Sequence, residues 1–249
     1  MTYVHRDISK TFIDGDIVAY RMAASADSNG YSFQSAAANV DRMIEDIIHE
    51  AMDFPGPSCF KVFLTGRGNF RYDIAKAAPY KGNRSGKPKP VYLEDLRIYM
   101  QEKWNAIVSE GEEADDLISQ AVTQEGPTSC VASIDKDMLQ LNCWHYNFVK
   151  RQWKFVEEFE GLHFFYSQIL TGDNADNIIG LNNVGPVKAA HMLEGCTTEK
   201  ALYQAEDGIR ELVSDWSSDV CSSDLRPYLL CSIHRQGHAT ATLLALQLR

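Results

Sequence analysis

The chain has 249 residues, 45% of them hydrophobic, which suits one large domain or a main domain with a small appendage. No apolar run approaches the length of a membrane span, and the start lacks the apolar stretch of a secretory signal, so we expect a cytoplasmic protein with no membrane partner. A net charge of −10 would exclude a nucleic-acid partner only if the charge were evenly spread, and acids and bases here fall in different segments.

Strands alternate with helices over the first 134 residues. Their order is strand 10–16, helix 17–26, helix 35–54, strand 60–65, helix 92–104, strand 106–108, helix 113–124 and strand 129–134. A hairpin at 146–156 and a helix at 158–171 follow. This alternation predicts an α/β fold with a doubly wound, mainly parallel sheet, whose functional site lies beyond the carboxyl ends of the strands.

Acidic residues recur directly after the apolar segments. Helix capping explains one or two of the acids at 112–116, and Asp16 suits the N-cap of the helix that follows it. Capping does not explain further pairs at Asp135/Asp137 and Asp173/Asp176. Carboxylates gathered from several segments repel one another unless a cation neutralises them, and Mg²⁺ prefers oxygen ligands. The pattern therefore predicts a multi-carboxylate metal centre.

Bases dominate residues 69–90, where Asp73 is the single acid. Three aromatic residues are interleaved with them, a pattern typical of segments that grip the phosphates of a strand and stack its bases. A solvated basic loop explains Lys87 and Lys89 equally well, but explains Tyr80-Lys81 less well. The bases are Arg71, Lys76, Lys81, Arg84, Lys87 and Lys89, and the aromatic residues are Phe70, Tyr72 and Tyr80.

The segment 172–190 reads as a hairpin between two short helices. Pro186 suits the first turn of a helix, and Gly185 leaves the N–H groups there open to a phosphate, with Lys188 adding charge. A backbone-gripping hairpin is one interpretation, and a plain helix turn is the alternative.

Taken together, these segments resemble the 5′-nucleases, a family that includes flap endonucleases and bacteriophage 5′–3′ exonucleases. The resemblance covers residues 11 to 195, and the short length suggests the bacteriophage branch. The motifs keep the family's order, and they are Ile13-Asp14-Gly15, Phe70-Arg71, Tyr80-Lys81-Gly82-Asn83-Arg84, Glu113-Ala114-Asp115-Asp116, Ser133-Ile134-Asp135-Lys136-Asp137 and Gly172-Asp173-Asn174-Ala175-Asp176-Asn177-Ile178.

The resemblance implies a PIN-like nuclease domain over 1–157 with a helical arch at 69–90, and a helix–hairpin–helix DNA-binding module over 158–205. It also implies two Mg²⁺ or Mn²⁺ ions. Asp14, Glu113, Asp115 and Asp135 would hold the first ion, and Asp116, Asp137, Asp173 and Asp176 the second. Arg71, Lys81 and Arg84 would engage the scissile phosphate, with Lys76, Tyr80 and Lys87 also on the DNA. Gly180, Gly185 and Lys188 would contact the DNA backbone, where a K⁺ often binds.

The implied activity is metal-dependent 5′–3′ exonuclease or structure-specific 5′ flap endonuclease action, as in DNA replication. Two metal ions can activate a water on one side of a phosphodiester and stabilise the leaving oxygen on the other. We expect a monomer that acts on DNA with a 5′ end, flap or nick, with an RNA primer strand as a further candidate substrate. A phage-encoded enzyme would work in the host cytoplasm.

Two features depart from the family pattern. Thr65 stands where an aspartate usually follows the second strand, which predicts loose binding of the first metal or the use of Asp16 in its place. Residues 206–249 begin with a stretch that resembles translated sequencing-adaptor sequence, so we expect a non-native tail and an incomplete DNA-binding module.

Two other functions compete with nuclease activity. In a haloacid-dehalogenase-like phosphatase, Asp14 and Asp16 would be nucleophile and acid, and Thr65 would lie in the phosphate-binding turn. This alternative leaves the acids at 113–116 and 135–137, the basic segment and the hairpin unexplained. The third possibility is a protein that binds branched DNA without cleaving it.

Overall fold

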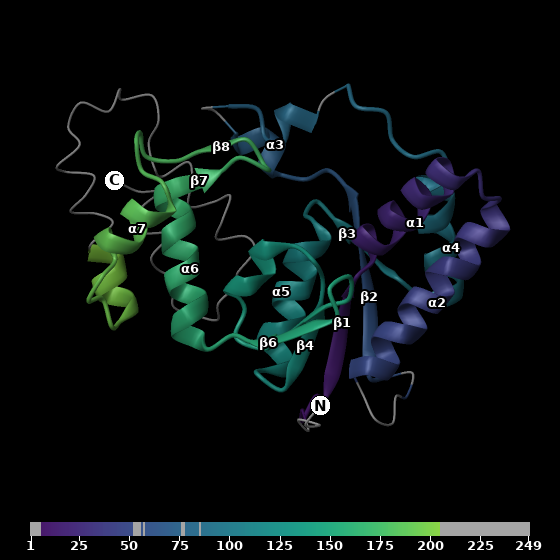
Figure 1. Cartoon of the computed structure of the whole chain (residues 1–249), viewed down its shortest axis with the longest axis horizontal. Helices are drawn as coiled ribbons and strands as arrows, with labels where there is room; N and C mark the ends of the chain where they lie inside the picture. The colour runs from purple at the N-terminus through teal and green to yellow at the C-terminus, as the bar shows by residue number, and fades with distance from the viewer. Residues whose placement is uncertain (1–5, 52–55, 57, 76–77, 85, 205–249) are drawn as a thin grey trace.

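The computed structural model describes residues 6–51, 56, 58–75, 78–84 and 86–204 (Figure 1). Lys76 and the predicted tail at 206–249 lie outside this part of the chain. The elements are β1 (Lys10–Asp14), α1 (Gly15–Asn29), α2 (Phe33–Ala51), β2 (Phe60–Arg67), α3 (Arg71–Ile74), η1 (Gly82–Arg84), α4 (Leu93–Trp104), β3 (Ile107–Glu110), α5 (Ala114–Glu125), β4 (Ser129–Ala132), η2 (Lys136–Gln140), β5 (Trp144–Asn147), β6 (Gln152–Phe155), α6 (Glu158–Thr171), β7 (Gly172–Asp173), β8 (Ile178–Ile179) and α7 (Pro186–Met192).

The main sheet has the strand order β3-β2-β1-β4-β5-β6. The first five strands are parallel and β6 pairs antiparallel with β5, so the predicted mainly parallel, doubly wound sheet and the 146–156 hairpin are confirmed. The chain leaves β1 toward β2 on one side and returns to β4 on the other. The carboxyl ends of β1 and β4 therefore flank the topological switch point, where sites form in such sheets.

Both faces of the sheet are covered by helices, so its central strands are apolar on both sides. Ile13 faces the core beneath α1, α2 and α4, whereas its neighbour Phe12 faces the core beneath α5. Val62 and Phe63 alternate in the same way on β2. Figure 1 shows α1, α2 and α4 grouped on one side of the strands and α5 on the other.

The turn from β1 into α1 is tighter than the sequence alone suggests. Helix α1 begins at Gly15, and Asp14 is its N-cap, accepting a hydrogen bond from the Ile17 N–H at 3.2 Å. The interpretation of Asp16 as the N-cap is therefore wrong. A side chain at position 15 would place its Cβ 2.6 Å from the Phe63 carbonyl oxygen, so only glycine permits this approach of helix to strand.

Helices α6 and α7 pack together in a second apolar cluster that includes Phe165, Ile169, Leu181 and Leu193. Gly172 ends α6 in a left-handed conformation with φ of 70° and starts the two-stranded β7–β8 hairpin. Figure 1 shows this hairpin reaching over the end of the main sheet toward α3. Among the described helices, none is long and apolar enough to cross a membrane.

Candidate active site

The ends of β1 and β4 are joined by a chain of polar contacts. The Ser133 hydroxyl donates to Asp14 Oδ2 at 2.8 Å and accepts from the Asp135 N–H at 3.0 Å. Asp135 Oδ1 in turn accepts from the Asp137 N–H at 2.9 Å, which begins η2. These bonds fix the orientation of Asp14 and Asp135 at the switch point of the sheet.

Helix α5 brings further acids to the same edge. Glu113 is its N-cap residue and Asp115 and Asp116 lie in its first turn. Asp115 interacts electrostatically with Asp14, Asp135 and Glu113, so acids from β1, β4 and α5 lie close together. The sequence predicted this convergence from the strand ends.

The charges of this group are incompletely compensated. Burial, together with the charge of Asp135, raises the pKa of Asp14 to about 6. Burial also raises the pKa of Asp115, with the charges of Asp14 and Asp135 adding to the effect. The pKa of Asp135 is raised by burial and by the neighbouring charge of Asp137. Negative charge crowded in this way favours the binding of a cation.

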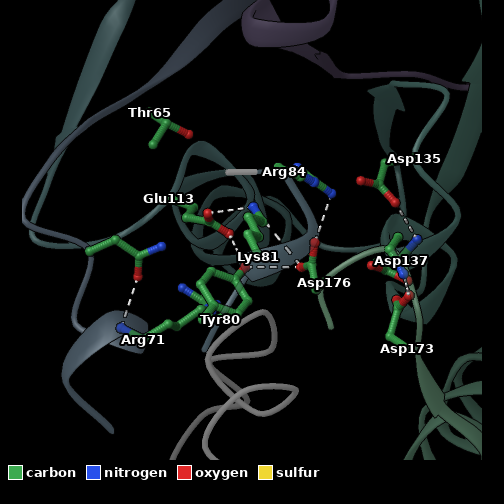
Figure 2. Close-up of polar contacts among 12 residues, drawn as sticks. Thr65, Arg71, Tyr80, Lys81, Arg84, Glu113, Asp135, Asp137, Asp173 and Asp176 are labelled. Carbon is green, nitrogen blue, oxygen red and sulfur yellow. Dashed lines mark hydrogen bonds and ion pairs between the residues drawn. The ribbon is translucent and has the colours of Figure 1, made fainter. Parts of the chain in front are cut away.

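The base of the arch segment, defined as residues 69–90, closes over these acids. Lys81 Nζ lies 2.6 Å from Glu113 Oε1 and 4.0 Å from Asp176 Oδ2, and Arg84 lies 2.8 Å from Asp176 Oδ1. Figure 2 shows Lys81 between Glu113 and Asp176. Although burial alone favours a neutral Glu113, the charge of Lys81 holds the pKa of Glu113 below its usual value.

Tyr80 belongs to this contact rather than to the surface. Its side chain is only 4% exposed, and its hydroxyl lies 2.8 Å from Glu113 and 2.9 Å from Asp176. Burial, reinforced by the charges of these carboxylates, raises the pKa of Tyr80. In this arrangement the ring is not presented to a base, unlike the stacking role expected from the sequence.

The arch segment is also bound to the β7–β8 hairpin through its backbone. The Lys81 N–H donates to the Asp176 carbonyl at 2.9 Å, and the Asn177 side chain donates to the Pro79 carbonyl at 2.9 Å. Asn83 donates to the Asn174 carbonyl at 2.7 Å. Segments almost a hundred residues apart in the sequence thus form one wall of the site.

Lys136 is a cation of the 133–137 motif for which the sequence predicts no role. Its Nζ lies 2.7 Å from Asp137 Oδ1 and 2.6 Å from Asp173 Oδ2. Although burial favours a neutral Asp173, the hydrogen bond from Lys136 lowers the pKa of Asp173. A basic residue flanked by two predicted ligands was the signal that could have identified it.

Arg71 and Asp116 differ from their predicted roles. Arg71 is 2% exposed, and its two terminal nitrogens each lie 2.7 Å from one oxygen of Asp116, which also accepts from the Glu113 N–H at 2.9 Å. Both oxygens of Asp116 are therefore engaged, and the Arg71 guanidinium is shielded from a phosphate. The pair ties the arch segment to the start of α5, so Asp116 acts as a helix cap, the simpler of the two interpretations of this acid.

Thr65 and Asp16 are also engaged within the protein. The Thr65 hydroxyl accepts from the Ala114 N–H at 2.9 Å, and its own N–H donates to Asp16 Oδ2 at 2.8 Å. Arg97 of α4 bonds to the other Asp16 oxygen and to the Thr65 carbonyl. Use of Asp16 in place of the missing aspartate would therefore require it to leave its contacts with Arg97 and Thr65. No motif in the sequence pointed to Arg97.

The remaining predicted DNA contacts lie on the surface. Lys87 is exposed in the arch segment, and Gly185 and Lys188 are exposed at the start of α7. Gly180 pairs closely with the end of α6, where an added Cβ would lie 2.1 Å from the Thr171 carbonyl carbon. This close approach explains why a glycine is needed at position 180, a structural role that the sequence did not predict.

The donor set suits a hard divalent cation, because it consists of carboxylates from β1, α5, β4, η2 and β7 at one edge of the sheet. Within the described residues, no three His, Cys, Asp or Glu side chains are arranged to hold a metal ion. Lys81, Arg84 and Lys136 contact the carboxylates instead. Metal binding would therefore require these basic side chains to exchange places with the ion.

Comparison with known proteins gives a consistent picture, although no family model matches the sequence. The chain is 26% identical over 218 residues to a 5′–3′ exonuclease of Buchnera aphidicola subsp. Schizaphis graminum, covering 80% of this chain and 75% of that protein. It is 28% identical over 189 residues to the flap endonuclease Xni of Colwellia psychrerythraea, covering 68% of this chain and 63% of that protein. A DNA polymerase I of Rhizobium leguminosarum is 32% identical over 152 residues, which are 53% of this chain and 14% of the polymerase.

The solved structures agree on the fold. T5 5′-exonuclease with bound zinc ions superposes with a TM-score of 0.60 at 16% identity, covering 95% of this chain and 98% of that one. The T5 D15 flap endonuclease with DNA and metal ions superposes with a TM-score of 0.55 at 15% identity, covering 96% and 99%. The chain has homologues named 5′–3′ exonuclease and flap endonuclease and it has the fold of T5 5′-exonuclease, so its resemblance to the 5′-nucleases is confirmed.

Proposed function

We propose that this protein is a metal-dependent 5′-nuclease that hydrolyses DNA phosphodiesters near a 5′ end, flap or nick. The observation that carries the proposal is the group formed by Asp14, Asp115 and Asp135 at the switch point of the sheet. Lys81 and Arg84 reach the acids from the arch segment. Carboxylates that can hold metal ions, with basic side chains beside them, suit the hydrolysis of a phosphodiester.

The carboxylates divide by position into two sets. We assign Asp14, Glu113, Asp115 and Asp135 to a first divalent ion, Mg²⁺ or Mn²⁺, and Asp137, Asp173 and Asp176 to a second. Asp116 leaves the second set because Arg71 binds both of its oxygens. Divalent ions bound there would supply an activated water and stabilise the leaving oxygen.

Lys81 and Arg84 have a second task in this proposal. Ions on the carboxylates would compete with both side chains for Glu113 and Asp176, and the released cations would be close enough to pair with the phosphate. Removal of one group that stabilises transition-state charge typically lowers the reaction rate about 10²–10³-fold. Lys81→Ala should therefore cleave at least a hundredfold more slowly than Lys87→Ala, because Lys87 is exposed and away from these contacts.

Binding of the DNA itself extends beyond the acids. We assign Lys87 to the strand that enters at the arch segment, and Gly180, Gly185 and Lys188 to the duplex backbone, with K⁺ a candidate ligand of the 180–188 turn. A helix–hairpin–helix module formed by α6, α7 and the segment between them, an RNA primer strand as substrate, and a monomeric state belong to the same proposal.

The test uses 5′-labelled flap and nicked duplexes with Mg²⁺ or with EDTA. We expect products only with Mg²⁺, and at least a hundredfold loss for Asp135→Asn. Glu125→Gln is the matched control, since Glu125 pairs with Lys10 at 2.5 Å at the opposite edge of the sheet and should retain activity. Cleavage in EDTA, or an active Asp135→Asn, would contradict the proposal. Binding without cleavage would favour the alternative of a branched-DNA-binding protein.

The structure gives the phosphatase alternative little support. Asp14 is 3% exposed and caps α1, and Asp16 is paired with Arg97 and the Thr65 N–H. Neither acid is presented as a nucleophile or proton donor to a small phosphate ester. Turnover of such an ester with no action on DNA would reverse this conclusion.

A further inference from the structure

Lys136 forms a bridge between two acids that belong to different elements. Its ammonium lies 2.7 Å from Asp137 Oδ1 in η2 and 2.6 Å from Asp173 Oδ2 in β7. The lysine side chain is 52% exposed, whereas that of Asp173 is 4% exposed. A solvent-accessible cation thus covers a buried carboxylate at the edge of the site.

Both carboxylates also accept hydrogen bonds from groups other than Lys136, Asp137 through the oxygen that Lys136 contacts and Asp173 through its second oxygen. Gln168 of α6 donates to Asp137 Oδ1 at 2.5 Å and is itself bonded to Gln140 at 2.6 Å. Asp173 Oδ1 accepts from the Ala175 N–H at 2.8 Å. Each acid therefore retains a hydrogen-bond donor if the ammonium withdraws, and the ammonium is the half-exposed member of the group.

The ammonium contacts the same two acids that we assign to the second ion, so the ammonium and the ion would compete for them. We propose that Lys136 is a built-in counterion of the second metal site, which stabilises Asp137 and Asp173 in the metal-free protein and must withdraw before a divalent ion binds there. This inference rests on the proposed metal centre. Because Lys136 competes with the ion, the second site binds a divalent ion with lower affinity than its carboxylates alone would give.

The geometry suits such an exchange. A lysine carries its charge on a flexible four-carbon stem, and a half-exposed ammonium can return to water at little cost. A divalent ion carries twice the charge and prefers oxygen ligands, so it outcompetes the ammonium at sufficient concentration. The Arg71–Asp116 pair is different, because both side chains are buried and the contact is bidentate.

The test compares Lys136→Gln, which removes the charge and retains most of the side-chain length, with the charge-retaining Lys136→Arg. Lys154→Gln is the matched control, because Lys154 pairs with Glu160 at 2.7 Å and is 49% exposed. Melting temperatures are measured in EDTA and in Ca²⁺, and Ca²⁺ binding is measured by calorimetry without DNA. We expect Lys136→Gln to have a lower melting temperature than wild type in EDTA and a larger rise in melting temperature on adding Ca²⁺. Of the two Ca²⁺ ions, it should bind the more weakly held one about tenfold more tightly than wild type does. Lys136→Arg and Lys154→Gln should gain as much from Ca²⁺ as wild type.

Each other outcome is decisive. If Lys136→Gln lowers the melting temperature equally in EDTA and in Ca²⁺ with unchanged Ca²⁺ affinity, Lys136 is merely structural and the inference fails while the metal centre stands. If neither wild type nor Lys136→Gln binds Ca²⁺ or Mn²⁺, the metal centre itself is overturned, and the inference with it.

Discussion

The buried Arg71–Asp116 pair makes a demanding prediction about stability. Replacing Arg71 with Met keeps much of the side-chain volume but leaves Asp116, which is 1% exposed, without its cation. Removing one member of a buried ion pair typically costs about 3–5 kcal/mol, because the remaining charge stays desolvated. The two contacts of 2.7 Å support a value of about 4 kcal/mol here.

The assay is urea unfolding at neutral pH, supported by thermal melts. For a protein of this size about 4 kcal/mol corresponds to a fall in melting temperature of roughly 8–16 °C. Arg84→Met is the control, since Arg84 is 53% exposed and its pair with Asp176 should contribute under about 1 kcal/mol. The double variant Arg71→Met/Asp116→Leu removes both charges and should recover part of the loss, since it also removes the acceptor of the Glu113 N–H.

Two results would refute this reasoning. A loss below about 1 kcal/mol for Arg71→Met would mean that the pair is not buried in solution. A double variant that regains stability but cleaves DNA more than a hundredfold slower would mean that Arg71 engages the phosphate, as the family resemblance implied. We expect its cleavage rate to stay within a fewfold of wild type.

Three further predictions concern other parts of the molecule. Burial lowers the pKa of His145 to about 4, below its value in the unfolded chain, so the stability that the neutral ring contributes is complete above pH 6.5 and is lost as the pH falls toward 4. Between pH 7 and pH 4.5, wild type should lose about 2 kcal/mol more unfolding free energy than His145→Leu in urea titrations. Equal losses would count against the pKa shift. Thr65→Ala removes the acceptor of the Ala114 N–H and should lower the free energy of unfolding by about 1 kcal/mol in chemical denaturation. Thr65→Ser keeps a hydroxyl and should lower it less. Equal losses in the two variants would mean that packing, and not this hydrogen bond, is responsible. Gly180→Ala should lower the melting temperature strongly, because the added Cβ would clash with Thr171. Gly185→Ala should melt like wild type, because no atom lies within 4 Å of its added Cβ. A larger fall in melting temperature for Gly185→Ala than for Gly180→Ala would contradict the described hairpin.

The alternation of strands and helices was readable from the sequence because it depends on local pattern. The continuous apolar run that contains Phe12 and Ile13, the glycine after α6 and the acids that follow β1 and β4 are all short-range signals. The carboxyl ends of parallel strands meet at one edge, so convergence of Asp14, Glu113 and Asp135 also followed from the pattern.

Which charge pairs with which was decided only by the tertiary structure. Arg71 and Lys81 had the same predicted task, yet the fold buries Arg71 against Asp116 and places Lys81 at Glu113. Thr65 likewise became a helix cap through a contact with Ala114, 49 residues away. Side-chain pairing depends on distances between segments far apart in the chain, and a linear pattern contains residue types and spacings but not those distances.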